Sequence, residues 1–237
     1  MIFKGWQKTS LIEYPGKIST VLFTGGCNFR CPFCYNTELV ERPGELADLS
    51  AEMVLQYLSE NRALYQAVVV SGGEPTLHSR LPEFFGRVKD LGLSTGLETN
   101  GTNPAMVSQL LQGAGVDFIG MDVKAPLKWS AYQAAAGLAE DRANLLEKVK
   151  RTLCLLKGAR VLVELRCTVV PGLHERADIL ALAEQLEGFP SFILQQFKPD
   201  GVLEPRMRKV KPFNPQDLED LRGRISRLFA RCELRGC

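Results

Sequence analysis

The chain has 237 residues, 45% of them hydrophobic and 24% charged, which is the usual balance for a globular protein with a full core. Its 29 basic and 27 acidic residues give a formal net charge of +2, which does not favour broad binding to nucleic acid or to a membrane surface. The first ten residues hold no apolar run typical of a signal peptide, and no stretch reaches the ~20 apolar residues of a membrane span. We therefore expect a cytoplasmic protein with a single domain over residues 1–237.

Short apolar runs alternate with helical patterns along the chain. Each run is rich in Val, Ile, Leu or Phe and ends in Gly, Pro or polar residues, as expected for strands buried on both faces. The runs predict six strands, at residues 18–24, 67–70, 93–98, 117–123, 160–170 and 191–197. The patterns between and after them predict helices at 51–62, 81–91, 104–112, 141–156 and 176–186, and a last helix that begins near 214.

This alternation predicts a parallel sheet, because parallel strands need crossover connections that helices usually supply. A complete eight-unit barrel takes about 250 residues, so six units with an N-terminal lead and a C-terminal helix fit this length better. We predict an α/β fold: a partial, open (β/α)6 TIM-like barrel with its core at about 16–200 and a C-terminal helical extension at about 201–237. Functional residues of such a barrel lie on the loops that follow the strands.

Three of the seven cysteines fall within eight residues, directly after the first predicted strand. Cys27, Cys31 and Cys34 have the spacing C-x3-C-x2-C on a loop that begins with two glycines. Three thiolates can hold three corners of a [4Fe–4S] cluster and leave the fourth iron open for an exogenous ligand. A structural zinc site needs a fourth Cys or His nearby, and the sequence has none there.

The other cysteines and the two histidines are scattered, and the sequence assigns them no chemistry. Cys154 and Cys167 fall in apolar patterns and are predicted core residues. Cys232 and Cys237 lie near an end of the chain that we expect to fray. His174 opens a predicted helix and is interpreted as a capping or surface residue.

With the aromatic Phe33 directly before its last cysteine, this loop resembles the cluster loop of the radical S-adenosylmethionine superfamily. The resemblance implies a [4Fe–4S] cluster on Cys27, Cys31 and Cys34 whose open iron binds the amine and carboxylate of S-adenosylmethionine, with Tyr35 among the cofactor-binding residues. One electron would then split the sulfonium into methionine and a 5′-deoxyadenosyl radical. The resemblance implies no catalytic residue beyond the cluster ligands.

Unusual residues also follow the second and third predicted strands. Gly72 and Gly73 permit a close approach of backbone to a ligand, and Glu74 is able to accept hydrogen bonds from a cationic amine. One βα unit after the cysteines, this Gly-Gly-Glu-Pro segment matches the amine-binding motif of the superfamily. Glu98 and Asn100 lie in a segment similar to one in activating enzymes for glycyl-radical proteins, where either contacts the ligand; a simple Asn-Gly turn is the alternative.

Charged residues end the fourth and fifth predicted strands. Asp122 and Lys124 point to the same side because side chains alternate along a strand, so they either pair or hold ligand groups. This segment resembles the Asp-Leu-Lys motif of pyruvate formate-lyase activating enzyme, which implies contact with S-adenosylmethionine. Arg166 either meets the adenosine or a carboxylate, or only stabilises the barrel. On the sixth strand, Gln196 or Phe197 stands where relatives often have a histidine that touches the ribose.

Nearly the whole chain resembles the activating proteins of anaerobic ribonucleoside-triphosphate reductase, including the opening segment 9–18. The resemblance implies hydrogen abstraction from a backbone glycine of a partner glycyl-radical enzyme, with a flavodoxin or ferredoxin as electron donor. One alternative is a radical S-adenosylmethionine enzyme that acts on a small molecule, such as a modified-base precursor. The other is a non-catalytic metal-binding interaction module, which leaves the Gly-Gly-Glu segment unexplained.

Overall fold

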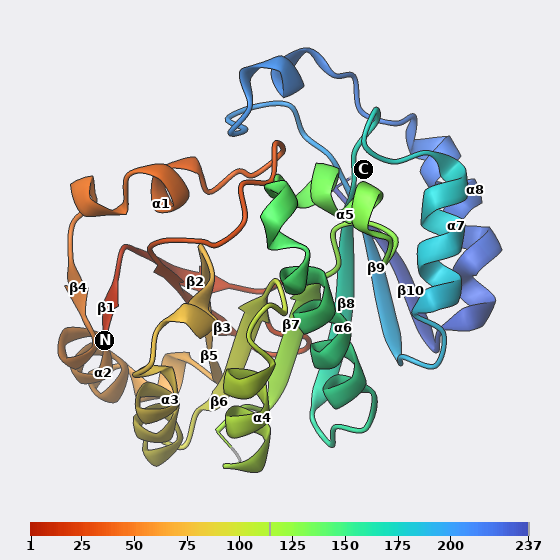
Figure 1. Ribbon diagram of the computed structural model, residues 1–237. Helices are drawn as coiled ribbons and strands as arrows, with labels where there is room; N and C mark the ends of the chain where they lie inside the picture. The colour runs from red at the N-terminus through yellow and green to blue at the C-terminus, as the bar shows by residue number, and fades with distance from the viewer. Residues whose placement is uncertain (114, 237) are drawn as a thin grey trace.

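The computed structural model describes residues 1–113 and 115–236, and one eight-stranded sheet with the order β10-β9-β8-β7-β6-β5-β3-β2 forms its centre (Figure 1). Six successive strands of this sheet are parallel. They are β3 (Ser19–Thr24), β5 (Ala67–Gly72), β6 (Ser94–Thr99), β7 (Phe118–Asp122), β8 (Leu162–Val169) and β9 (Ser191–Gln196). All six predicted strands are confirmed to within two residues, and so is the α/β class with a partial, open TIM-like barrel.

Helices cover the outer face of the sheet (Figure 1). The predicted ones are α2 (Ala51–Glu60), α3 (Leu81–Asp90), α4 (Pro104–Gln112), α6 (Asn144–Lys157), α7 (Arg176–Gln185) and α8 (Pro215–Ile225). The Oγ of Ser50 accepts a hydrogen bond from Met53 N at 3.2 Å and so caps α2. Two further helices, α1 (Thr37–Glu41) and α5 (Trp129–Ala136), were not predicted.

Short elements complete the connections between the strands and helices. A two-stranded antiparallel sheet joins β1 (Ile2–Phe3) to β4 (Leu49–Ser50). Short 3-10 helices lie at η1 (Pro43–Glu45), η2 (Arg62–Leu64), η3 (Pro75–Leu77), η4 (Glu140–Arg142), η5 (Pro205–Lys209) and η6 (Ser226–Leu228). The segment predicted as the start of the fourth helix is η4, and α6 begins only at Asn144.

Both edges of the sheet carry strands that the sequence did not predict. β2 (Gly5–Ser10) pairs antiparallel with β3, and β10 (Arg231–Arg235) pairs parallel with β9. The expectation of a fraying end is therefore wrong for Cys232, which lies opposite Phe192 in β9; Cys237 lies outside the described residues. The predicted C-terminal extension contains α8 but ends in a strand, because α8 packs on β10 and returns the chain to the sheet.

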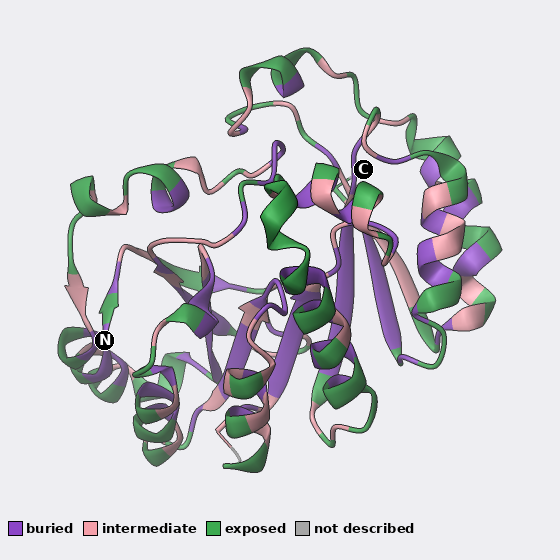
Figure 2. Cartoon of the chain, in the orientation of Figure 1, coloured by how far each residue is buried: buried purple, intermediate pink, exposed green. Residues whose placement is uncertain are grey.

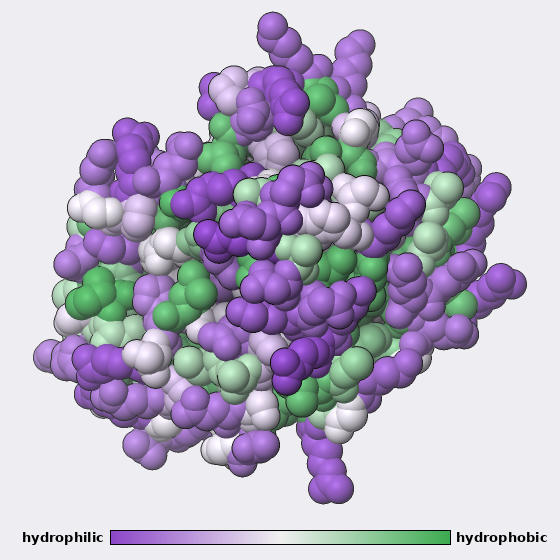
Figure 3. Space-filling view, in the orientation of Figure 1, coloured by the Kyte–Doolittle hydropathy of each residue, from purple (hydrophilic) through white to green (hydrophobic). Residues whose placement is uncertain are grey.

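The parallel strands are buried on both faces (Figure 2). Their outward side chains pack against the helices in one large apolar core, to which Val68 and Val70 belong. A smaller cluster that includes Tyr14, Val69 and Phe118 fills part of the inner face. The face of the molecule seen in Figure 3 is mainly hydrophilic, with scattered apolar side chains. Within residues 1–113 and 115–236, no helix is both long and apolar enough to span a membrane.

A buried network of charges occupies the inner face beside this small apolar cluster. Arg166 of β8 donates through Nε to Glu164 at 2.7 Å, and through Nη1 to Glu98 of β6. Its guanidinium crosses β7 over Gly120, where a Cβ would lie 3.0 Å from Arg166 Nη2. Glu164 is 1% exposed and also accepts two bonds of 2.8 Å from Arg235 of β10. The network therefore joins β6, β8 and β10 across the inside of the sheet.

We expect Glu164→Gln to destabilise the protein by about 3 kcal/mol, because it removes one of the two carboxylates that compensate the buried guanidinium of Arg166. The matched control is Arg176→Ala, which removes an exposed ion pair with Asp217 and costs less than about 1 kcal/mol. Urea unfolding followed by circular dichroism measures both changes. Equal, small shifts in the two midpoints would show that the buried network does not stabilise the sheet.

Candidate functional site

A cavity of about 330 Å³ lies at the carboxyl ends of the parallel strands, within the size range of small-molecule sites. Every predicted site residue except Glu74 lines it: Cys27, Cys31, Cys34, Tyr35, Gly72, Gly73, Glu98, Asn100, Asp122, Lys124 and Arg166. These residues come from the loops and strand ends of β3, β5, β6, β7 and β8. The structure thus brings the separately predicted segments together around one space.

Backbone hydrogen bonds from two neighbouring segments fix the path of the cysteine loop. The carbonyl of Gly26 accepts a hydrogen bond from Glu74 N at 2.8 Å, which joins the cysteine loop to the end of β5. The N–H of Arg30 donates to the carbonyl of Ala136 at 3.0 Å, at the end of the unpredicted helix α5. Both contacts use the backbone, so they hold the path of the loop whatever its side chains bind.

A second set of backbone bonds reaches the cysteine loop from the segment between β9 and α8. Leu203 N donates to Cys34 O and Glu204 N donates to Pro32 O, each at 3.0 Å. This segment arches over the carboxyl ends of the strands (Figure 1). The backbone N–H of Lys198 also donates to the Tyr35 hydroxyl at 2.6 Å, so Tyr35 contacts this segment as well as the cavity.

Two glycines make room for the close approach of the β5 loop to the cysteine loop. Gly72 has a φ of +118°, a conformation that side chains rarely adopt. A Cβ on Gly73 would lie 1.9 Å from Gly26 O. The side chain of Asn36, from the cysteine loop, donates to Gly72 O at 2.9 Å. The predicted close approach at these glycines is therefore made by backbone of the chain itself.

The three thiols are buried enough to favour their neutral forms. Burial raises the pKa of Cys27 to about 11 and that of Cys31 to about 12, and it also raises the pKa of Cys34. For all three, the positive charge of Lys124 acts in the opposite direction. Metal ligation requires thiolates, so binding at this loop must release protons.

The donor set fits an iron–sulfur cluster better than a single ion. Three soft sulfur ligands from one loop line one cavity, a set that selects Fe–S or zinc. Among the residues that the structure describes, no three His, Cys, Asp or Glu side chains lie close enough together to hold one metal ion. Ligands at separate corners of a cubane need wider spacing than the ligands of one zinc ion, so the arrangement fits a [4Fe–4S] cluster.

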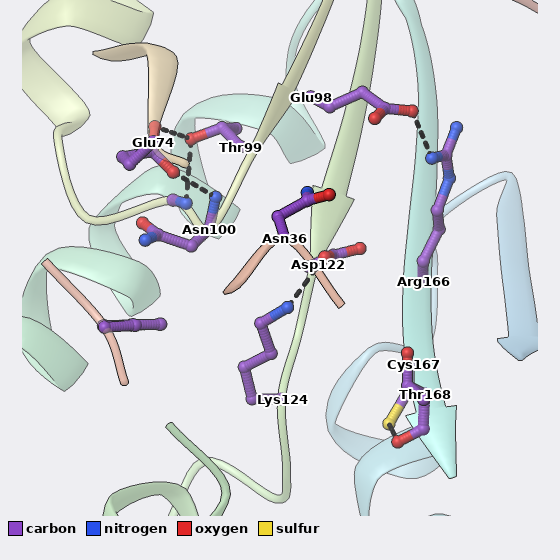
Figure 4. Close-up of polar contacts among 12 residues, drawn as sticks. Asn36, Glu74, Glu98, Thr99, Asn100, Asp122, Lys124, Arg166, Cys167 and Thr168 are labelled. Carbon is purple, nitrogen blue, oxygen red and sulfur yellow. Dashed lines mark hydrogen bonds and ion pairs between the residues drawn. The ribbon is translucent and has the colours of Figure 1, made fainter. Parts of the chain in front are cut away.

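Glu74 lies behind the cavity, not on its surface. It is fully buried, and its carboxylate accepts hydrogen bonds from the Thr76 N–H, the Thr76 and Thr99 hydroxyls, and the Asn100 N–H (Figure 4). Burial raises the pKa of Glu74, and these donors act against that rise. The predicted hydrogen bond to an amine is not supported by this geometry, because the chain's own groups surround both oxygens.

Asp122 and Lys124 form the predicted pair, with Lys124 Nζ 2.7 Å from Asp122 Oδ2 (Figure 4). Burial acts to lower the pKa of Lys124, but the Asp122 carboxylate together with the neighbouring Cys31 and Tyr132 groups raises it above its ordinary value. Arg166 is likewise engaged, by Glu98 and Glu164, which supports the barrel-stabilising alternative. Each pair still faces the cavity, so these groups define a charged wall on the side of β6, β7 and β8.

Sequence reasoning missed Glu13, which lines the cavity from the turn after β2 and lies 3.6 Å from Arg166 Nη1. Burial and the neighbouring Glu98 carboxylate raise the pKa of Glu13 to about 7. The only sequence signal for this residue is an acid directly after the apolar pair at 11–12. The pKa of Glu13 is shifted only because the fold buries this side chain beside Arg166 and Glu98.

Other expectations about single residues divide between confirmed and wrong. His174 is 2% exposed, not at the surface, and its ring contacts Val170 N and Lys124 O, at 3.0 and 2.7 Å. At the sixth strand, the Gln196 side chain donates to Phe213 O at 2.7 Å, and its neighbour Gln195 lines the cavity instead. The cysteines outside the loop are split: Cys167 is buried as predicted, whereas Cys154 is exposed.

We expect Gly73→Ala to abolish stable cluster binding, because its Cβ would displace Gly26 and with it the start of the cysteine loop. Iron and sulfide per chain after anaerobic reconstitution provide the measurement. Gly86→Ala is the control: that glycine lies in α3 with open space around its Cβ position, so alanine is expected to stabilise the helix by about 0.5–1 kcal/mol. A Gly73→Ala variant with normal iron content would contradict the tight contact.

The raised pKa of Glu13 predicts a stability that falls as pH rises. The folded chain keeps this proton up to about pH 7, whereas the unfolded chain loses it near 4.5, so the folded state binds more protons across that window. Glu13→Gln, which cannot ionise, is expected to lose less stability than the wild type between pH 5 and pH 7. Thermal unfolding midpoints at several pH values test this, with the exposed Glu83→Gln as control. Parallel curves for wild type and Glu13→Gln would contradict the assignment.

Comparison with known proteins identifies the same family that the cysteine loop resembles. The model of the "Radical SAM superfamily" matches residues 21–186. A candidate glycyl-radical enzyme activating enzyme of Methanocaldococcus jannaschii is 29% identical over 230 residues, which are 96% of this chain and 92% of that protein. Sequence similarity therefore extends through most of both chains.

Solved structures share the fold at lower sequence identity. SuiB of Streptococcus suis, solved with S-adenosylmethionine, aligns with a TM-score of 0.63 at 17% identity over 92% of this chain, which spans about half of that protein's length (52%). QueE of Escherichia coli aligns with a TM-score of 0.52 at 18% identity, over 100% of this chain and 92% of that one. Because the family model covers more than half of the chain and includes the cysteine loop, this protein belongs to the radical SAM superfamily, whose members use a [4Fe–4S] cluster and S-adenosylmethionine.

Proposed function

We propose that this chain is an activating enzyme. It generates a radical on a backbone glycine of a partner protein, a glycyl-radical enzyme. The observation that carries the proposal is a groove of about 740 Å³ that continues sideways from the cavity. The groove runs between segment 11–16 and strands β9 and β10, and it shares Glu13, Tyr35, Thr168 and Gln195 with the cavity lining.

The rim of this groove suits a segment of another protein. Leu11 and Ile12 are 71% and 69% exposed, which is unusual for two adjacent large apolar side chains. Strand β10 forms the opposite wall and lies at the edge of the sheet, where no other strand of residues 1–113 and 115–236 pairs with its outer side. An extended peptide segment placed in the groove would contact the apolar rim and bring one residue to the cavity. Glycine suits that innermost position because it has no side chain to obstruct the approach.

When bound, the [4Fe–4S] cluster supplies the electron that splits S-adenosylmethionine into methionine and a 5′-deoxyadenosyl radical. Cys27, Cys31 and Cys34 hold the cluster, and Gly72 and Gly73 line the cavity beside this loop. The charged wall of β6, β7 and β8 excludes apolar groups from that side of the cavity. Transfer of a hydrogen atom from the glycine Cα to the 5′ carbon would leave 5′-deoxyadenosine and a glycyl radical.

Further support comes from the relative in Methanocaldococcus jannaschii, whose name assigns it to the glycyl-radical activating enzymes and which matches over nearly its whole length. We take anaerobic ribonucleoside-triphosphate reductase as the first candidate partner, and a flavodoxin or ferredoxin as the electron donor. An oxygen-sensitive cluster and unpaired cysteines suit a reducing compartment, so we propose that the protein acts in the cytoplasm.

We expect the anaerobically reconstituted, reduced protein to convert S-adenosylmethionine to 5′-deoxyadenosine, and Cys31→Ala to lose this activity by at least about a hundredfold. Cys154→Ala, at an exposed position on α6, is expected to retain it. Addition of the partner reductase is expected to produce a glycyl-radical signal in electron paramagnetic resonance spectra.

Each alternative function gives a different result in this assay. Deoxyadenosine without a glycyl radical on any tested partner, but with turnover of an added small molecule, would favour the small-molecule enzyme. A fully loaded cluster that yields no deoxyadenosine under strong reductant would favour the non-catalytic module and contradict the radical chemistry itself.

A further inference from the structure

The side chain of Asn100 points at a cluster cysteine at the wall of the cavity. Asn100 directly follows β6 and is 7% exposed. Its Nδ2 atom lies 2.9 Å from Asn28 Oδ1 and 3.8 Å from the Sγ of Cys27, a distance within hydrogen-bonding range for sulfur. Both N–H groups of this amide are therefore directed at the cysteine loop.

The orientation of the amide is fixed by its oxygen. Asn100 Oδ1 accepts from the backbone N–H of Thr102 at 3.0 Å and from the Thr102 hydroxyl at 2.6 Å. A backbone N–H only donates, so an exchange of the amide oxygen and nitrogen would place two donors against each other. Asn28 Nδ2 in turn donates to Thr102 Oγ1 at 2.7 Å. Asn28, Thr102 and Asn100 thus form a closed ring of hydrogen bonds next to Cys27.

The backbone of Asn100 is held as firmly as its side chain. Asn100 N donates to the buried carboxylate of Glu74 at 2.7 Å, and Glu74 also accepts from the Thr99 hydroxyl at 2.7 Å. These bonds join the end of β6 to the turn after β5 (Figure 4). The donor at Cys27 is therefore preorganised by groups on three separate segments of the chain.

An N–H donor on a ligating sulfur affects the charge that the cluster carries. Reduction adds an electron to the cluster and makes its thiolates more negative, so an N–H dipole aimed at the sulfur favours the reduced form. Cys27 also accepts from the Phe29 backbone N–H at 3.4 Å. Within the described part of the chain, Asn100 is the only side chain with an N–H in range of the Cys27, Cys31 or Cys34 sulfur.

We propose that Asn100 is a positioning residue that raises the reduction potential of the cluster through its amide N–H on Cys27. Asn28 and Thr102 keep that amide in place. The inference goes beyond the proposed function, because every radical SAM reaction needs the same reduced cluster whatever its substrate. It also gives Asn100 a role other than the ligand contact that the sequence offered for either Glu98 or Asn100.

Two substitutions separate a donor role from a packing role. Asn100→Ala removes the donor and leaves space, whereas Asn100→Asp keeps the shape and the oxygen that Thr102 contacts but puts negative charge near the sulfur. Both retain the backbone bond to Glu74. Asn61→Ala is the control, since it removes an amide whose Nδ2 bonds Tyr57 O on α2, far along the chain from the site.

The midpoint potential of the reconstituted protein, from a redox titration followed by electron paramagnetic resonance, is the measurement. We expect Asn100→Ala to lower it by up to about 59 mV, which is tenfold in a one-electron equilibrium, and Asn100→Asp to lower it further. Asn61→Ala is expected to leave it unchanged.

The order of the two variants decides the outcome. A packing role predicts the opposite order, with Ala more harmful than the isosteric Asp. Potentials equal to the wild type in both fully loaded variants would overturn the proposal. Loss of iron from both variants while Asn61→Ala loads normally would also overturn it, in favour of a purely structural contact.

Discussion

The guanidinium of Arg166 has to cross a neighbouring strand to reach its partners, and the missing side chain at Gly120 makes that crossing possible. Gly120 lies in register between Glu98 of β6 and Glu164 of β8. A buried cation is costly unless paired and hydrogen-bonded, and here the carboxylates of Glu98 on β6 and Glu164 on β8 supply the compensation. The inside of the sheet on this side is therefore held by charge, where other barrels use layers of branched apolar residues.

This charged network determines where the functional cavity lies. Arg166 and Glu98 belong both to the network and to the cavity lining, so the groups that join the strands also form a wall of the site. The cysteine loop covers the opposite side and is fixed through backbone bonds to the β5 loop, to α5 and to the segment before α8. A site whose supports come from distant segments is preorganised only when the whole sheet is formed.

The sequence allowed the parallel strands, most helices and the cysteine loop to be predicted, because each of these signals is local. Strand β10 was missed because Arg231, Glu233 and Arg235 alternate with only two less polar residues and look like a solvated end. Arg231 and Arg235 form ion pairs with Glu164, about 70 positions earlier, and no local pattern shows that contact. Cys154 was wrongly predicted as a core residue because its neighbours on the helix form an apolar stripe. In the structure its own side chain lies at the exposed edge of α6.

Prediction was least successful for the direction in which a side chain points within a correct motif. The Gly-Gly-Glu-Pro segment was found, yet the structure turns Glu74 inward, where four donors from the β5 turn and the end of β6 converge on it. An acid at this position accepts from all four, whereas an amide would set its own N–H groups against them. The carboxylate thus fixes Asn100, which faces Cys27, so its effect reaches the cluster loop through positioning. Motif residues can therefore matter for a cofactor without touching it, and only the hydrogen-bond pattern distinguishes the two roles.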